Sequence, residues 1–236
     1  MTGVFPFWEK VVAPVLEAAG VQRLVEIGAL RGEQTQLILD RLGPGAELHV
    51  IDPVPEFDPD EHRAPLPVLV LHDVGWPYGR RDLYYDPDNV PAEHRQPWAH
   101  QGMRPGNPGL VGGGGLNPTM ANARREGGRR NGVHTALDDF VAEWDQPLRQ
   151  VVLPIYFGLA IVVEESRLAR QPELAAVLDH LESPEGKDLL LELAEAMRIE
   201  AMIFQHRIYF QNEATIAGLA DRYLDRADKA GRAIGF

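Results

Sequence analysis

Residues 24–35 constrain the fold of this chain more than any other stretch. They read LVEIGALRGEQT, which is a short apolar run, a turn bounded by two glycines and the start of a helix. Gly28 can adopt a positive φ and lets a ligand approach the backbone, and Gly32 lets the helix begin close to the strand. The N–H groups at such a helix start favour an anionic or electron-rich ligand. The stretch therefore predicts the ligand-binding turn of an α/β domain.

Two acidic residues flank this turn. Glu26, at the end of the predicted strand, can accept hydrogen bonds from a cationic or hydroxylic group of a ligand. The apolar run 48–51 ends in Asp52, and an acid at this position of a βαβ unit commonly binds the ribose of a nucleotide. The alternative is a glycine turn in an ordinary α/β domain that binds no ligand.

Composition excludes several classes of protein. The formal net charge of −12 argues against nucleic-acid and anionic-membrane partners. The absence of cysteine excludes a disulfide framework, a thiolate zinc site and a cysteine nucleophile. No window reaches the roughly 18 apolar residues of a membrane span. The first residues, MTGVFPFWE, lack the basic start of a signal peptide, so we expect a cytoplasmic protein.

The predicted elements follow the order of an α/β domain over residues 1–170, with a helical extension over residues 171–236. Helical apolar spacing and β-branched runs distinguish helices from strands. The helices of the extension are candidates for a homodimer interface, for a cap over the substrate pocket or for a loosely held tail. We expect, in chain order, a helix over 7–19 that Pro14 kinks or breaks, a strand over 22–27, a helix over 33–42, strands over 46–51 and 67–71, a helix over 135–144 with Thr135 as its N-cap, a hairpin of strands over 149–155 and 159–164, and helices over 172–232.

Residues 74–130 are the segment that we expect to cover the active site. The segment is rich in Gly, Pro, Asn, Arg and aromatic residues and shows little periodicity. A loop of this length inside a small domain is either functional or disordered. It follows the C-terminal end of a predicted strand, where ligands bind in open α/β sheets. The alternative interpretation is a disordered insertion.

Several side chains of this segment are candidates for acceptor binding. Arg80 and Arg81 lie among aromatic residues and can hold an anionic or sugar-like acceptor, or can pair with acids of this acidic protein. His94 and His100 are kept as weaker candidates because the same segment carries them. The sequence leaves both interpretations of the two arginines open.

His72 and Asp73 are the candidate catalytic pair. They follow the apolar run 67–71 at the edge of the sheet where α/β enzymes place their chemistry. A reaction at a hydroxyl oxygen needs that oxygen to be deprotonated or polarised and held in line with the atom it attacks. His72 is the natural general base near neutral pH, and Asp73 is a hard oxygen ligand suited to Mg²⁺. The alternative is that both residues only cap the following turn.

Four stretches of the sequence resemble class I S-adenosylmethionine (SAM)-dependent methyltransferases. The Glu-x-Gly-x-x-x-Gly pattern is similar to their motif I, whereas its glycine spacing fits an NAD-dependent oxidoreductase poorly. The resemblance covers about residues 20–165 and points to the macrocin O-methyltransferase and cephalosporin-hydroxylase-like branch. It rests on VEIGALRG at 25–32, VIDP at 50–53, LHDVGWP at 71–77 and LPIYFG at 153–158.

The resemblance implies a fold and a set of site residues. The fold is a Rossmann-like, mostly parallel sheet that ends in an antiparallel hairpin. The activity is SAM-dependent O-methyl transfer to a small hydroxylated or sugar-containing acceptor. His72 and Asp73 would act as base or metal ligand, with Asp73 on Mg²⁺. The SAM-binding residues would be Glu26, Gly28, Ala29, Gly32 and Asp52.

The sequence departs from this family between Asp52 and Pro67, where there is room only for a loop. The family places two further strand–helix units there, each of about 30 residues. The chain is then either an internally deleted version or a minimal fold in which the strand at 67–72 lies beside the first strand. Two functions remain open: an active methyltransferase, or a catalytically inactive relative that acts as a binding or oligomerisation protein.

Overall fold

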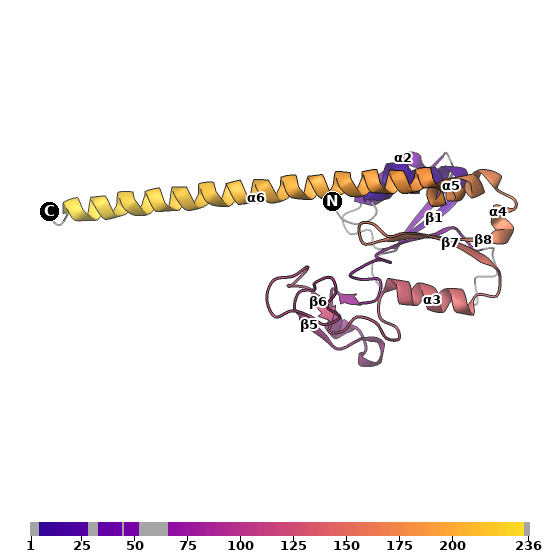
Figure 1. Cartoon of the computed structure of the whole chain (residues 1–236), viewed down its shortest axis with the longest axis horizontal. Coiled ribbons are helices and arrows are strands. Elements are labelled where there is room, and N and C mark those ends of the chain that lie inside the picture. The colour runs from indigo at the N-terminus through magenta and orange to yellow at the C-terminus, as the bar shows by residue number, and fades with distance from the viewer. Residues whose placement is uncertain (1–4, 28–32, 44, 52–65, 234–236) are drawn as a thin grey trace. The chain divides into compact units, whose positions relative to one another are not determined.

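The computed structural model describes residues 5–27, 33–43, 45–51 and 66–233 (Figure 1). The chain divides into two compact units, residues 1–191 and residues 192–236. The first unit is a mixed α/β structure with three small sheets. The second unit consists of the continuation of one helix, α6 (Pro184–Ala233).

The central strand of the first unit is β8 (Leu159–Glu164), whose residues are all buried. It runs antiparallel to both of its neighbours, β3 (Leu69–His72) and β7 (Leu148–Leu153). The two flanking strands are therefore parallel to each other. The β7–β8 pair is the hairpin that the sequence predicts, and its register places Leu153 opposite Leu159 across the turn.

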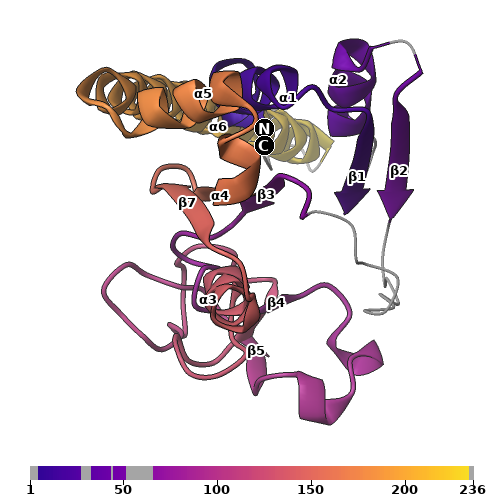
Figure 2. The same cartoon turned by 90° about the vertical axis from the view of Figure 1, so that its right-hand side faces the viewer.

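Helices cover both faces of this three-stranded sheet, and β8 alternates its side chains between them. Leu159, Ile161 and Val163 enter the larger core, which the N-terminal helical segment and α5 (Pro172–Glu182) close. Ala160 and Val162 enter a smaller core on the other face, beneath α3 (Val133–Glu143). Figure 2 shows α3 and α5 on opposite sides of the sheet. A strand buried on both faces needs an unbroken apolar run, which explains LAIVV.

The N-terminal segment breaks into two helical pieces close to Pro14, as the sequence predicts. A short turn, η1 (Phe5–Phe7), and a π-helical turn, η2 (Trp8–Val12), lead into α1 (Ala13–Ala18). Proline lacks an N–H and is tolerated in the first turn of a helix, so α1 begins at this point. α4 (Glu165–Leu168) follows β8 and leads to α5, which contacts α1.

The two strands next to the glycine turn form a separate parallel sheet. β1 (Arg23–Ile27) pairs with β2 (Glu47–Ile51), and α2 (Glu33–Arg41) connects them. Figure 2 shows the two strands side by side with the same direction. These elements match the predicted strand–helix–strand unit.

The described strands do not form the single, mostly parallel sheet that the sequence predicts. β1 pairs with β2 alone and β3 pairs with β8 alone among the described strands. The minimal fold in which β3 lies beside β1 is therefore wrong. The physical reason is that no described strand lies between the two ladders to join them by hydrogen bonds.

Residues 74–132 have a defined structure of their own rather than that of a disordered insertion. β6 (Ala121–Ala123) pairs on its two sides with β4 (Leu83–Tyr84) and β5 (Trp98–His100), antiparallel in both cases. Two 3₁₀ turns, η4 (Pro87–Asn89) and η5 (Ala92–His94), connect β4 to β5. Such short strands carry too few residues for a periodic sequence signal, which explains why the sequence predicts a loop.

The N-cap of α3 differs from the prediction. Gly132, with a φ of +95°, precedes the first helical residue, and Thr135 lies inside the first turn. The Thr135 hydroxyl donates a hydrogen bond to the carbonyl oxygen of Asn131 at 2.9 Å instead of capping the helix. No described helix is long and apolar enough to cross a membrane.

Candidate functional site

Glu26 is the one predicted SAM-binding residue that the structure describes, and its surroundings fit a ligand site. Its side chain lies at the end of β1 and is 5% exposed. The hydroxyl of Thr35, on α2, donates a hydrogen bond of 2.6 Å to its Oε2 atom. Its Oε1 atom is buried and has no hydrogen-bond partner among the described residues. Since a buried carboxylate oxygen without a donor is destabilising, this atom is available to a donor on a ligand.

The other predicted SAM-binding residues, Gly28, Ala29, Gly32 and Asp52, lie outside the described residues. The strands that lead to them are described, and Ile27 and Ile51 are register partners in the parallel ladder. The chain therefore leaves both strands at the same edge of the sheet. This edge is where parallel α/β sheets bind ligands.

One face of the β1–β2 sheet exposes apolar side chains. Val25 and Ile27 are 49% and 60% exposed, although they belong to a strand. The opposite face contributes Leu24 and Leu48 to the larger core. An apolar face of this kind in an α/β sheet is normally covered by a helix.

His72 and Asp73 lie together at the end of β3, as the sequence predicts. The Nε2–H group of His72 donates to the carbonyl oxygen of Tyr156 at 3.2 Å, and its Nδ1 atom lies 3.4 Å from Oδ1 of Asp73. The imidazole ring makes edge contacts with Phe7 and Phe157. Its side chain is 15% exposed and that of Asp73 is 37% exposed. The pair is thus fixed in position while Asp73 remains accessible.

Three non-glycine residues with positive φ meet at this edge of the sheet. Asp73 has a φ of 65°, and Tyr156 and Phe157 in the facing hairpin turn have φ values of 48° and 70°. For residues with a side chain this conformation costs about 1 kcal/mol or more each. Strained backbone persists where the surrounding contacts determine it, and it concentrates at functional sites. The conformation of Asp73 therefore supports a role beyond that of an ordinary turn residue.

The structure favours one of the two interpretations of Arg80 and Arg81, because both pair with acids. Arg80 is bound to Asp138 of α3 at 2.6 Å and to the hydroxyl of Thr135 at 3.2 Å. Its side chain is 40% exposed, so this ion pair contributes little to stability. Arg80 connects the segment 74–132 to α3.

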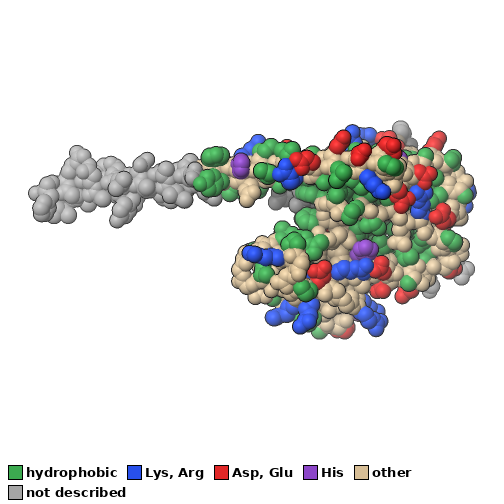
Figure 3. Space-filling model, in the orientation of Figure 1, with side chains coloured by type: hydrophobic (Ala, Val, Ile, Leu, Met, Phe, Trp, Pro, Cys, Tyr) green, Lys and Arg blue, Asp and Glu red, His purple; other side chains and the backbone are tan. Residues whose placement is uncertain are grey.

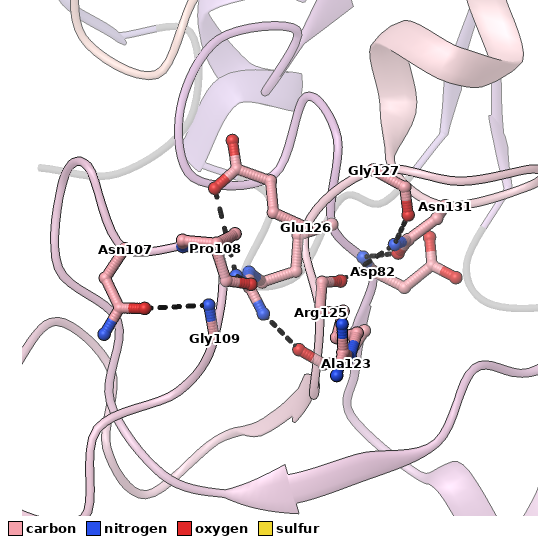
Figure 4. A network of polar contacts seen from close by, with 10 residues as sticks. Asp82, Asn107, Pro108, Gly109, Ala123, Arg125, Glu126, Gly127 and Asn131 are labelled. Carbon is pink, nitrogen blue, oxygen red and sulfur yellow. Dashed lines mark hydrogen bonds and ion pairs between the residues drawn. The ribbon is translucent and has the colours of Figure 1, made fainter.

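Arg81 is a structural brace of the segment 74–132. Its side chain is 1% exposed and donates to the carbonyl oxygens of Ala123 and Pro108, with Glu126 at 3.9 Å (Figure 4). Burial lowers the pKa of Arg81, and the carboxylate of Glu126 partly offsets this effect. An acceptor cannot reach a guanidinium that is enclosed in this way.

Asn131 is a second brace that the sequence did not single out. Its side chain accepts a hydrogen bond from the backbone N–H of Asp82 and donates to the carbonyl oxygens of Arg125 and Gly127 (Figure 4). It is 2% exposed. A single Asn in a glycine-rich loop gives no sequence signal for this role, because one of its partners, Asp82, lies 49 residues away in the chain.

A cationic pocket of about 390 Å³ lies within the same segment. Gln96 fixes its floor by donating to the carbonyl oxygens of Arg129 and Arg130 at 3.0 and 3.2 Å. Residues 74–132 contain eight arginines against five acids, in a chain with a net charge of −12. This concentration is the signal that could have identified the pocket from the sequence. The lining residues are Glu93, His94, Arg95, Gln96, Arg129 and Arg130.

The described residues do not complete a site for Mg²⁺. No group of three or more His, Asp or Glu side chains in the described part of the chain is placed to hold a metal ion. His72 and Asp73 alone would leave a divalent cation without most of its oxygen ligands. The assignment of Asp73 as a metal ligand stays a prediction.

Comparisons with protein-family models, with curated proteins and with solved structures found no match to this chain.

Proposed function

We propose that this protein is a SAM-dependent methyltransferase that transfers a methyl group to an oxygen of a small hydroxylated or sugar-containing acceptor. The observation that carries the proposal is the buried, unpartnered Oε1 atom of Glu26 at the end of β1. The position of Glu26 in the sequence is that of the acid in motif I of class I methyltransferases, which the sequence resembles. A hydroxyl or amino group of the cofactor would supply the missing donor.

The order and direction of the strands also support this proposal. In class I methyltransferases the last strand of a Rossmann-like sheet is antiparallel to its neighbours. Here β8 is the last strand of the chain and lies antiparallel between two mutually parallel strands, β3 and β7. In this proposal the β1–β2 pair and the three-stranded sheet correspond to two parts of one Rossmann-like sheet. The exposed apolar face with Val25 and Ile27 is where the missing strand–helix units would have supplied cover.

The residues at the end of β3 supply the acid–base chemistry of the proposed reaction. Bound SAM provides the methyl group on a sulfonium. Because the Nε2–H group of His72 donates to Tyr156, Nδ1 is the ring nitrogen that takes the proton from the acceptor hydroxyl. The carboxylate of Asp73 stabilises the resulting imidazolium at Nδ1. The deprotonated acceptor oxygen would be the nucleophile toward the methyl group that bound SAM would supply.

Calorimetric titration with S-adenosylhomocysteine tests the cofactor site directly. We expect micromolar binding to the wild-type chain and none for NAD⁺, the ligand of the competing oxidoreductase class. Glu26→Gln weakens the binding by roughly tenfold to a hundredfold, since one charged hydrogen bond contributes about 1.5–3 kcal/mol. Glu47→Gln is the matched control, because Glu47 is exposed on the neighbouring strand and pairs with Arg23 and His49.

A folded wild-type chain that binds neither ligand contradicts the proposal. In that case the missing strand–helix units were essential to the cofactor site. The catalytically inactive binding or oligomerisation protein is then the better description.

A further inference from the structure

The described part of α6 beyond residue 195 carries an exposed apolar stripe, which we call the α6 stripe. Its members are between 38% and 64% exposed. Apolar side chains gather along this part of the helix in Figure 3. Large apolar side chains clustered on one helix face mark a surface that another protein element covers. The stripe consists of Ile199, Met202, Ile203, Tyr209 and Phe210.

The spacing within the α6 stripe is that of a coiled coil. Ile199, Ile203 and Phe210 are separated by four and seven residues, and His206 occupies the intervening position. These four residues take the alternating core positions of a heptad, with Met202 and Tyr209 along one edge. Phe204 lies on a different face of the helix and is 65% exposed.

We propose that a second copy of this chain covers the α6 stripe as an antiparallel helix pair. In this pairing Ile199 packs against Phe210 of the partner subunit, and Ile203 packs against His206 of the partner subunit. Because the two copies are identical, each layer occurs twice and the contact closes on itself as a twofold dimer. The inference does not depend on the proposed methyltransferase activity.

The charges beside the stripe select a second copy as the occupant. Glu200 and Arg207 lie seven residues apart on the same edge of the helix. In the antiparallel register this edge lies against the same edge of the partner helix. Glu200 therefore faces Arg207 of the partner subunit, and Arg207 faces Glu200 of the partner subunit. The stripe is thus complementary to itself in charge.

The same charges disfavour a parallel pair. A parallel coiled coil brings Glu195 of one helix against Glu200 of the partner subunit, and the contact is repulsive in both copies. Glu195 is already bound to Arg198 of its own helix at 2.7 Å. Reversing the direction of one helix removes the repulsion between acids.

The opposite edge of the stripe is also complementary to itself. Met202 and Tyr209 are the residues of that edge, and the antiparallel register places Met202 against Tyr209 of the partner subunit. One edge of the pair is therefore ionic and the other apolar. This arrangement fixes the register, since a shift by one heptad would place like charges opposite each other.

Sedimentation equilibrium of the full chain tests the proposal through charge exchange. We expect a dimer for the wild type, and dissociation constants higher by about tenfold or more for Glu200→Arg and for Arg207→Glu, since each change makes two attractive pairs repulsive. An equimolar mixture of the two variants restores the dimer as a heterodimer. The double variant, Glu200→Arg with Arg207→Glu, also restores it.

A second pair of variants tests the apolar layers. Ile203→Glu places a charge in the proposed core and gives a monomer, whereas the matched change Phe204→Glu on another face leaves the dimer intact. Far-ultraviolet circular dichroism confirms that both variants keep their helix content. His206→Leu tightens the dimer because it replaces a polar residue in an apolar layer.

Two outcomes overturn the proposal. A wild-type chain that stays monomeric up to its solubility limit shows that a second copy does not cover the stripe. Stronger self-association of Glu200→Arg shows a parallel pair, because that substitution removes the repulsion from Glu195 of the partner subunit.

Discussion

Gly75 donates its backbone N–H to the carbonyl oxygen of Phe157 at 2.6 Å, which joins the turn after β3 to the turn between β7 and β8. The contact leaves no space for a side chain, because a Cβ atom on Gly75 would lie 2.8 Å from that carbonyl oxygen. It also fixes the backbone close to His72 and Tyr156. The geometry of the candidate catalytic pair therefore depends on two glycine-containing turns.

Gly75→Ala tests this contact through stability. We expect a loss of about 1–3 kcal/mol in the free energy of unfolding, because the backbone of both turns must shift to admit the methyl group. Urea denaturation followed by tryptophan fluorescence measures it. Gly112→Ala is the control, since a Cβ atom there meets nothing within 4 Å, and its effect stays within about 0.5 kcal/mol. Equal effects of the two variants would contradict the predicted role of the contact.

Arg81→Met tests the buried brace of the segment 74–132. We expect roughly 2–4 kcal/mol of destabilisation, because the carbonyl oxygens of Ala123 and Pro108 lose their donor in a buried place. Arg81→Lys gives a smaller loss of stability, since an ammonium group keeps the charge but lacks the forked N–H donors of the guanidinium. Arg104→Met, at an exposed arginine of the same segment, is expected to be neutral. Chemical denaturation of all three variants gives the comparison.

Tyr84 provides a pH-dependent test of the same segment. Burial raises the pKa of Tyr84 to about 12, and the hydrogen bond from the N–H of Gln96 opposes this shift. The unfolded chain loses this proton near pH 10, so the folded state binds more protons between about pH 10 and pH 12. The stabilising contribution is complete below pH 10 and is lost as the pH rises through 12.

Absorbance titration of tyrosinate measures this prediction, with stability recorded at each pH. Tyr84→Phe removes this late-ionising tyrosine and flattens the fall in stability above pH 10. The substitution also removes the hydrogen bond to Asp82 at 2.8 Å, so its stability at neutral pH is the reference for the comparison. Absorbance lost from the transition near pH 10, rather than near pH 12, would show that Tyr84 ionises like an exposed tyrosine.

His72→Ala and Asp73→Ala test the proposed chemistry. We expect methyl transfer to fall by about 10²–10⁴-fold in His72→Ala, the usual contribution of a general base, with S-adenosylhomocysteine binding retained. Asp73→Asn removes the negative charge but keeps the backbone conformation, because asparagine tolerates the positive φ at this position. A loss of activity in Asp73→Asn assigns the effect to the carboxylate. Full activity in both His72→Ala and Asp73→Asn would leave the pair with a structural role alone.

The sequence predicted those elements whose signals are local. β1, α2 and β2 lie within a residue or two of their expected ranges, because an apolar strand, a glycine turn and a helical period are properties of neighbouring residues. The β7–β8 hairpin was equally clear, since its two β-rich runs are separated by a short turn. The sequence also placed His72 and Asp73 at the end of a strand, because both residues follow the apolar run that forms β3.

Tertiary structure decided the rest, because the responsible contacts join residues far apart in the chain. The sequence could not choose between a ligand and a structural partner for Arg81, whereas the fold places it against Ala123 and Pro108. It predicted Thr135 as the N-cap of α3. In the structure Gly132 precedes the first helical residue, and the Thr135 hydroxyl donates to the carbonyl oxygen of Asn131. The division of the strands into separate sheets likewise depends on which strands pair with each other in the folded chain. Local patterns fix strands and helices, and long-range packing and hydrogen bonds fix where they meet.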